Sequence, residues 1–159
     1  MSDKNYVNIL IESLQKKIEL LDRLSELDRQ QESILTAEKY DNDAFDQVIE
    51  KKTALITKLD FMDSGFDATY NRIKRELVGN RDQYREEIKK LQELIAIVTE
   101  KSAGIQAMEL RVQQKLQSTF RGERQKLRQS KTTVQAVTGY YKTMSNTAYV
   151  DSQYLDQKK

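Results

Sequence analysis

The sequence predicts an all-α protein, an elongated antiparallel bundle of three to four long helices with coiled-coil-like packing. The chain of 159 residues contains no Pro and five Gly, whereas average usage would give roughly eight Pro and eleven Gly. A β-sandwich or barrel needs a turn about every 8–12 residues, so this scarcity of turn formers argues against one. Apolar residues also recur at spacings of three and four over long stretches, which is the period of one helix face.

The first helix is expected over residues 3–38. Its apolar stripe, which thins at Asp28 and Gln31, is flanked by Ile11, Leu27 and Ile34. A short polar break follows at residues 39–43, where Asn42 or Asp43 is expected to cap the next helix through its side-chain oxygen. The stripe itself consists of Val7, Leu10, Leu14, Ile18, Leu21, Leu24 and Leu35.

The second helix is expected over residues 43–78. Its stripe crosses Gly65 without a change of phase, which predicts one continuous helix with an interior Gly that costs about 1 kcal/mol. Gly79 is a suitable residue to end it, although the phase also survives from Leu77 to Tyr84, so the alternative is a helix that runs straight on. The stripe consists of Phe45, Val48, Lys52, Leu55, Leu59, Met62, Phe66, Tyr70, Ile73 and Leu77.

The third helix is expected over residues 81–118, with Gly104 as a local weak point. Short joints between the three helices predict one bundle domain over residues 1–120, with neighbouring helices antiparallel. Residues 121–159 are expected to form a C-terminal amphipathic segment and tail, which either adds a fourth helix or stays loose. The third stripe consists of Tyr84, Ile88, Leu91, Ile95, Val98, Ile105, Met108, Val112 and Leu116.

The composition argues against an enzyme. With no Cys and no His, the chain has neither a thiol nucleophile, nor a Ser-His-Asp triad, nor an imidazole ligand. The acidic run from Asp41 fails as a calcium loop, because its sixth position is Asp46 and its twelfth is Lys52. The pairs and runs of charge at residues 50–52 and 86–87 are expected to be surface charges. We therefore expect no catalytic residues, no cofactor and no metal site.

Charge is distributed unevenly along the chain. Residues 1–63 carry 14 acidic and 9 basic side chains, whereas residues 101–159 carry 4 and 11. The two regions are therefore expected either to attract each other within the bundle or to be solvated separately. If residues 121–131 are helical, a basic stripe forms, and it raises the alternative of nucleic-acid binding through phosphate contacts. That stripe consists of Arg121, Arg124, Arg128 and Lys131.

The segment from residue 134 to residue 144 has apolar and aromatic side chains at helical spacing. It is expected either to pack on the bundle as a fourth helix or to act as an adhesive segment that orders on a partner helix. Tyr and Met favour partner binding, since they are large and adaptable contact residues. The candidate partner-binding residues are Val134, Val137, Tyr140, Tyr141 and Met144.

The sequence resembles the flagellar export chaperones of the FlgN type found in anaerobic Gram-positive bacteria. The similarity begins with Tyr6-Val7 in the first helix and ends with the tail at residues 154–159. Between them it includes the runs at residues 45–56, 63–66, 70–72, 76–77 and 140–142. It covers nearly the whole chain, although it consists of helical patterns with few rigid motifs.

The resemblance implies a cytoplasmic, non-enzymatic chaperone of type III export. Such proteins bind the C-terminal helical region of hook–filament junction proteins, prevent their premature assembly and deliver them to the flagellar export machinery. In the family the C-terminal segment binds the cargo and can be flexible when free, which corresponds here to residues 134–144.

Two other functions stay open from the sequence. The chain is compatible with a coiled-coil scaffold or oligomerisation protein without cargo, or with a nucleic-acid binder through the basic stripe. Nucleic-acid binding is the less favoured alternative, because Glu123 interrupts the basic stripe and the net charge of the chain is only +2. We expect no membrane insertion, because no apolar stretch is long enough to span a bilayer and the N-terminus lacks an apolar signal core. A weak homodimer is compatible with the pattern, and the absence of Cys fits a cytoplasmic location.

Overall fold

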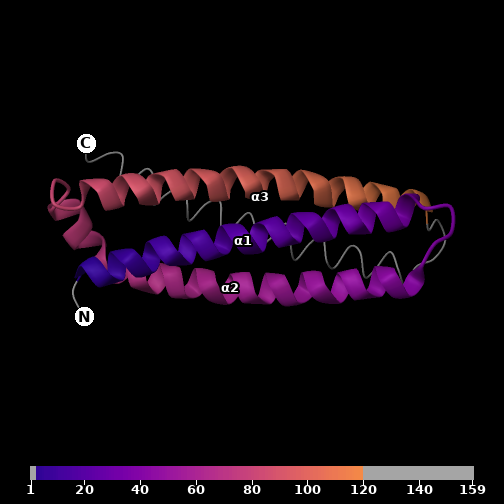
Figure 1. Cartoon of the computed structure of the whole chain (residues 1–159), viewed down its shortest axis with the longest axis horizontal. Helices are drawn as coiled ribbons and strands as arrows, with labels where there is room; N and C mark the ends of the chain where they lie inside the picture. The colour runs from indigo at the N-terminus through magenta and orange to yellow at the C-terminus, as the bar shows by residue number, and fades with distance from the viewer. Residues whose placement is uncertain (1–2, 120–159) are drawn as a thin grey trace.

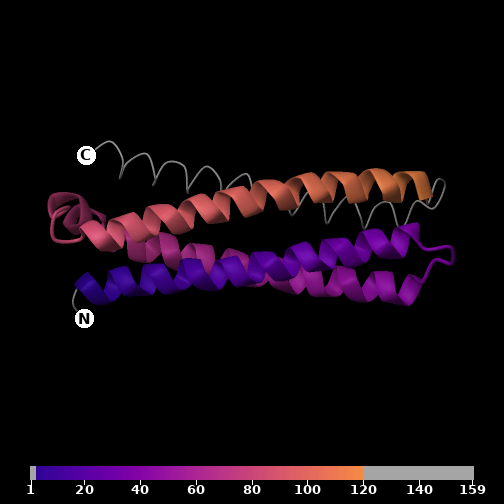
Figure 2. The same cartoon turned by 45° about the horizontal axis from the view of Figure 1, so that its top comes forward.

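Three long α-helices run side by side along a common axis (Figures 1 and 2). The computed structural model describes residues 3–119, in which α1 spans Asp3–Thr36, α2 spans Asn42–Gly79 and α3 spans Arg85–Thr119. The described residues contain no strand. The expected all-α bundle is therefore confirmed, and no helix in this part of the chain is long and apolar enough to cross a membrane.

The first connection is capped one residue earlier than the sequence suggested. The side chain of Asp41 accepts a hydrogen bond of 3.0 Å from the backbone N–H of Ala44, so Asp41 is the N-cap of α2. The expectation of Asn42 or Asp43 as the cap was wrong, because both residues already lie in the first turn of the helix. Asp43 still places a negative charge near the positive end of the helix dipole.

The second connection is a tight turn that separates α2 from α3. The backbone N–H of Asn80 donates to the carbonyl of Glu76 at 3.0 Å, and the side-chain amide of Asn80 donates to the same carbonyl at 3.0 Å. Both bonds satisfy the carbonyl of Glu76 in the last turn of α2, which ends at Gly79 as expected. The turn continues through Tyr84, so α3 begins at Arg85, four residues after the expected start at residue 81.

Neither interior Gly interrupts its helix. α2 is continuous through Gly65, and α3 is continuous through Gly104. A Cβ atom added at either position would meet no atom within 4 Å outside the local helix backbone. The continuity of α2 is thus as expected from the unbroken phase of its apolar stripe.

The three helices do not pack equally on one another. In the view of Figure 1, α1 lies between the other two helices, and it packs along both of them, whereas α2 and α3 meet far less within the described residues. A large apolar core joins all three helices over most of their length. A smaller core lies at the end with the α1–α2 connection and consists of Leu35, Phe45, Val112 and Leu116.

The apolar stripes form the core, with changes where the helical phase drifts. Ile18 and Leu55 are only partly buried, whereas Leu20 and Ile56 are buried. An α-helix has 3.6 residues per turn, so a stripe read at spacings of three and four moves slowly around the helix. Polar side chains are also buried in the interior, namely Lys17, Asp28, Gln31, Lys52, Ser102 and Glu109.

Candidate partner-binding surface

A buried polar cluster joins the three helices. Lys52 of α2 places its Nζ 2.6 Å from Oε1 of Glu109 in α3 and 2.9 Å from Oδ1 of Asp28 in α1. The same Nζ donates to Oε1 of Gln31 at 2.8 Å. The side chains of Lys52 and Asp28 are 0% exposed. The expectation that residues 50–52 carry only surface charges was therefore wrong for Lys52.

The cluster holds two carboxyl groups against one ammonium group. Burial raises the pKa of Asp28 to about 8, and a hydrogen bond with Glu109 adds to the rise, while Lys52 opposes it. The raised pKa of Asp28 favours its protonated form at neutral pH, which reduces the repulsion between the two buried carboxyl groups. Since Lys52, Asp28 and Glu109 are shielded from solvent, this cluster can fix the register of the helices but is closed to a ligand.

A second charged contact links α1 and α2 nearer the N-terminus. Lys17 is buried and forms an ion pair and hydrogen bond with Asp63. Burial lowers the pKa of Lys17, and Asp63 opposes that change. Burial raises the pKa values of Asp60 and Asp67, and the charge of Asp63 raises them further. Within residues 3–119, no group of acidic side chains is arranged to hold a metal ion.

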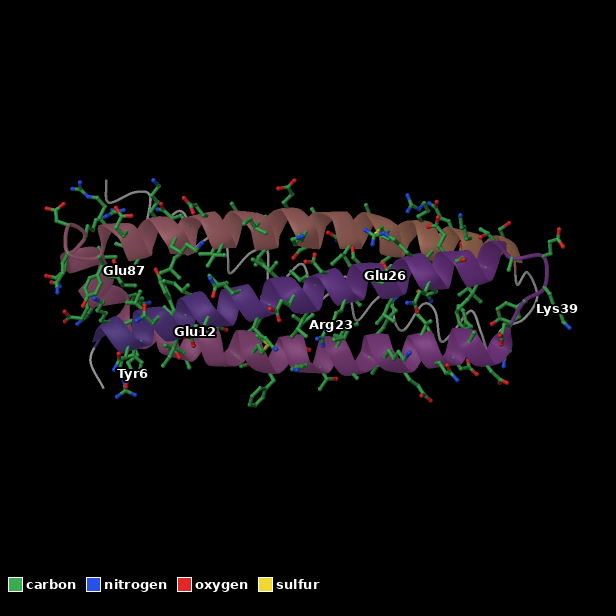
Figure 3. The ribbon with its side chains drawn as sticks, viewed as in Figure 1. Tyr6, Glu12, Arg23, Glu26, Lys39 and Glu87 are labelled. Atoms are coloured by element: carbon green, nitrogen blue, oxygen red, sulfur yellow. The ribbon has the colours of Figure 1, made fainter. Side chains whose placement is uncertain are left out.

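A shallow groove runs between α1 and α2, open to solvent, with a volume of about 450 Å³. Its floor is apolar and consists of Leu27, Ala54 and Leu55. Its rim is charged and consists of Arg23 and Glu26 from α1 and Lys51 and Lys58 from α2, and Figure 3 labels the two α1 residues. This surface is therefore apolar at its base and mainly cationic at its edges.

A depression between α1 and α3 has a different character. Lys101 at its edge pairs with Asp22 at 2.7 Å, and Ser25 donates to the sulfur of Met108 at 3.9 Å. Further along the same two helices, Glu32 pairs with Arg111 at 2.9 Å and with Lys115. These contacts join acidic residues of α1 to basic residues of α3, in agreement with the attraction that was one of the two expectations.

One large aromatic side chain is exposed on α2. Phe61 is 81% exposed, the highest value among the large apolar side chains of residues 3–119. It lies seven residues after Ala54, and so on the same side of the helix. Phe61 was not predicted from the sequence as a binding residue, because it falls outside the stripe that contains Met62. An aromatic residue that breaks the phase of a stripe was the available signal.

The candidate residues from the sequence lie outside the described part of the chain. They comprise the partner-binding set Val134, Val137, Tyr140, Tyr141 and Met144 and the basic stripe Arg121, Arg124, Arg128 and Lys131. The expected division between a bundle and a segment over residues 121–159 falls there too. The groove between α1 and α2 and the exposed Phe61 are the surface features that the structure adds.

The fold and its surfaces define an elongated helical bundle with a groove on one side. Comparison with known proteins assigns no narrower class: no family model, no curated protein and no solved structure matches the chain.

Proposed function

We propose that this protein is a flagellar export chaperone that holds a helical region of a hook–filament junction protein in the cytoplasm before export. The observation that carries the proposal is the incomplete set of helix pairs in residues 3–119. Among the described residues, α1 packs closely on both α2 and α3, whereas α2 and α3 have few close backbone contacts with each other. In a four-helix bundle each helix has two close neighbours, so a further helix beside α2 and α3 would complete the set.

An amphipathic helix of a cargo protein suits this position. Its apolar face would extend the core that the three helices already share. In this proposal the cargo helix is also held by the C-terminal segment, through Val134, Val137, Tyr140, Tyr141 and Met144. The chaperone would thereby cover the cargo surface that otherwise starts assembly.

The test uses the full chain and peptides from the C-terminal helical regions of hook–filament junction proteins. Val137→Asp/Tyr141→Asp is expected to weaken binding about tenfold or more in calorimetric titration, because it places charge in an apolar contact. Gln135→Asp/Thr143→Asp adds the same charge at neighbouring polar positions and is expected to retain binding. Truncation after Ser130 is expected to act like the first variant, provided that far-UV circular dichroism shows the helices intact.

Three results would count against the proposal. If the unaltered chain bound none of these peptides, hook–filament junction proteins would be ruled out as its cargo. Equal binding by the two double variants would show that the C-terminal segment is not the site. A stable higher oligomer in light scattering, with no peptide binding, would favour a scaffold instead.

A further inference from the structure

The groove between α1 and α2 carries three cations that have no ion-pair partner among the described residues. Arg23, Lys51 and Lys58 form no ion pair or hydrogen bond there, and Glu26, the one acidic residue on the rim, is engaged by Arg29 at 3.0 Å. We infer that this groove binds an acidic amphipathic helix of a partner protein, separately from any contact made by residues 134–144.

The floor of the groove fits the apolar face of a helix. Lys51, Ala54, Leu55 and Lys58 follow the spacing of one face of α2, so the groove runs along the helix axes. The methyl group of Ala54 is short beside its long neighbours, and this difference creates the hollow. Leu27 is 8% exposed and closes the base from the α1 side. Aliphatic side chains spaced three or four residues apart would lie along such a floor.

The rim selects the charge of the occupant. Lys51 and Lys58 are two turns apart on α2, roughly 10 Å along its axis, and Arg23 stands on α1 across the groove. Cations on both edges favour a helix with Asp and Glu on both sides of its apolar stripe. The same rim cations disfavour a helix flanked by Lys or Arg, because like charges that face each other across an interface cost free energy.

Phe61 supplies a second, independent feature beside the groove. Its side chain is 81% exposed. It lies two turns after Ala54 on the same side of α2. Exposed aromatic residues are enriched in binding surfaces, where they act as anchors. A partner helix of three to four turns that lies over Ala54 would be long enough to reach Phe61.

Charge complementarity argues against the two occupants that the protein itself could supply. Residues 120–159 contain eight Lys and Arg but three Asp and Glu, so this segment matches the rim in sign. A second copy that docked groove to groove would bring the same cations together. A separate acidic partner avoids both conflicts.

The experiment measures binding of a designed probe to the full chain by fluorescence anisotropy. The probe is a peptide of about three heptads with Leu at the a and d positions and Glu at the e and g positions. Its counterpart has Lys in place of Glu. We expect the Glu peptide to bind at least tenfold more tightly than the Lys peptide, and we expect its affinity to fall as salt is raised.

Matched variants separate the groove from the overall charge of the chain. Lys51→Glu/Lys58→Glu is expected to lower the affinity of the chain for the Glu peptide about tenfold or more. Lys89→Glu/Lys90→Glu makes the same charge change at exposed positions of α3 and is expected to have little effect. The inference would be overturned if the two variants lost affinity for the Glu peptide equally, or if the unaltered chain bound the Glu and Lys peptides equally well.

A photo-crosslinking residue at Ala54 in the full chain identifies the occupant directly. A crosslink to the Glu peptide supports the inference. A crosslink to residues 120–159 of the same chain, or to a second copy, at the expense of the peptide would overturn it. Because Val137→Asp/Tyr141→Asp leaves the groove unaltered, this inference and the proposed chaperone function fail independently.

Discussion

Lys52 of α2 and Glu109 of α3 form an ion pair of 2.6 Å in the interior of the bundle, with both side chains almost completely shielded from solvent. α2 and α3 have few close backbone contacts among the described residues. This ion pair is therefore a direct side-chain link between two helices whose backbones make few close contacts with each other, in addition to the apolar cores that both helices share.

Lys52→Met is expected to destabilise the protein by about 3–5 kcal/mol, since it leaves two buried carboxyl groups without their cation. Urea unfolding followed by circular dichroism measures the change. Lys51→Met, at the exposed neighbouring position, is expected to change the free energy of unfolding by at most about 0.5 kcal/mol. Similar losses in the two variants would show that Lys52 is not a structural cation.

Asp28→Asn is expected to remove part of the pH dependence of stability. The pKa of Asp28 is about 8 in the folded chain against 3.8 for an ordinary Asp, so between these values the folded state holds a proton that the unfolded state releases. The contribution of Asp28 to stability is therefore lost as pH rises from about 4 to about 8 and changes little above that.

The measurement for Asp28 compares urea unfolding of the unaltered chain and Asp28→Asn across this pH range. Asn resembles the protonated carboxyl group and does not titrate, so the variant is expected to lose less stability as pH rises. Asp60 and Asp67 also have raised pKa values, but their contribution is common to both proteins. Parallel pH profiles would contradict the assignment.

Gly65→Ala and Gly104→Ala are each expected to stabilise the protein by about 0.5–1 kcal/mol. Both positions lie inside continuous helices, and a new Cβ atom meets nothing within 4 Å, so the gain comes from the lower backbone entropy of the unfolded chain. Thermal unfolding measures the gain. Ala68→Gly, at an exposed position of α2, is the reverse change and is expected to cost a similar amount.

Asp41→Ala is expected to cost about 1 kcal/mol, because the backbone N–H of Ala44 loses the acceptor that caps α2. Asp43→Ala is expected to cost less, since Asp43 contributes only its charge in the first turn. Chemical unfolding of the two variants decides between the residues. A larger loss for Asp43→Ala would place the cap where the sequence alone suggested it.

For Lys52, the helical periodicity predicted burial correctly, whereas its residue type predicted exposure to solvent. Lys52 lies in phase with Val48 and Leu59 in the stripe of the second helix, and this phase indicated an inward direction. Its charge suggested solvent, and that interpretation was wrong. In α1, Asp28 and Gln31 were recognised only as a thinning of the stripe, although both contact Lys52.

The all-α class, the three long helices and their approximate ends could be predicted from the sequence, because backbone hydrogen bonds and the periodicity of an apolar stripe depend on residues close together in the chain. Which charges meet across the bundle depends on how the helices pack, and it could not be predicted in that way. The partners of Lys52 come from α1 and α3, and their distances depend on how the helices are staggered and rotated. The same packing decided that Ala54 leaves a groove beside α1 and that Phe61 faces solvent.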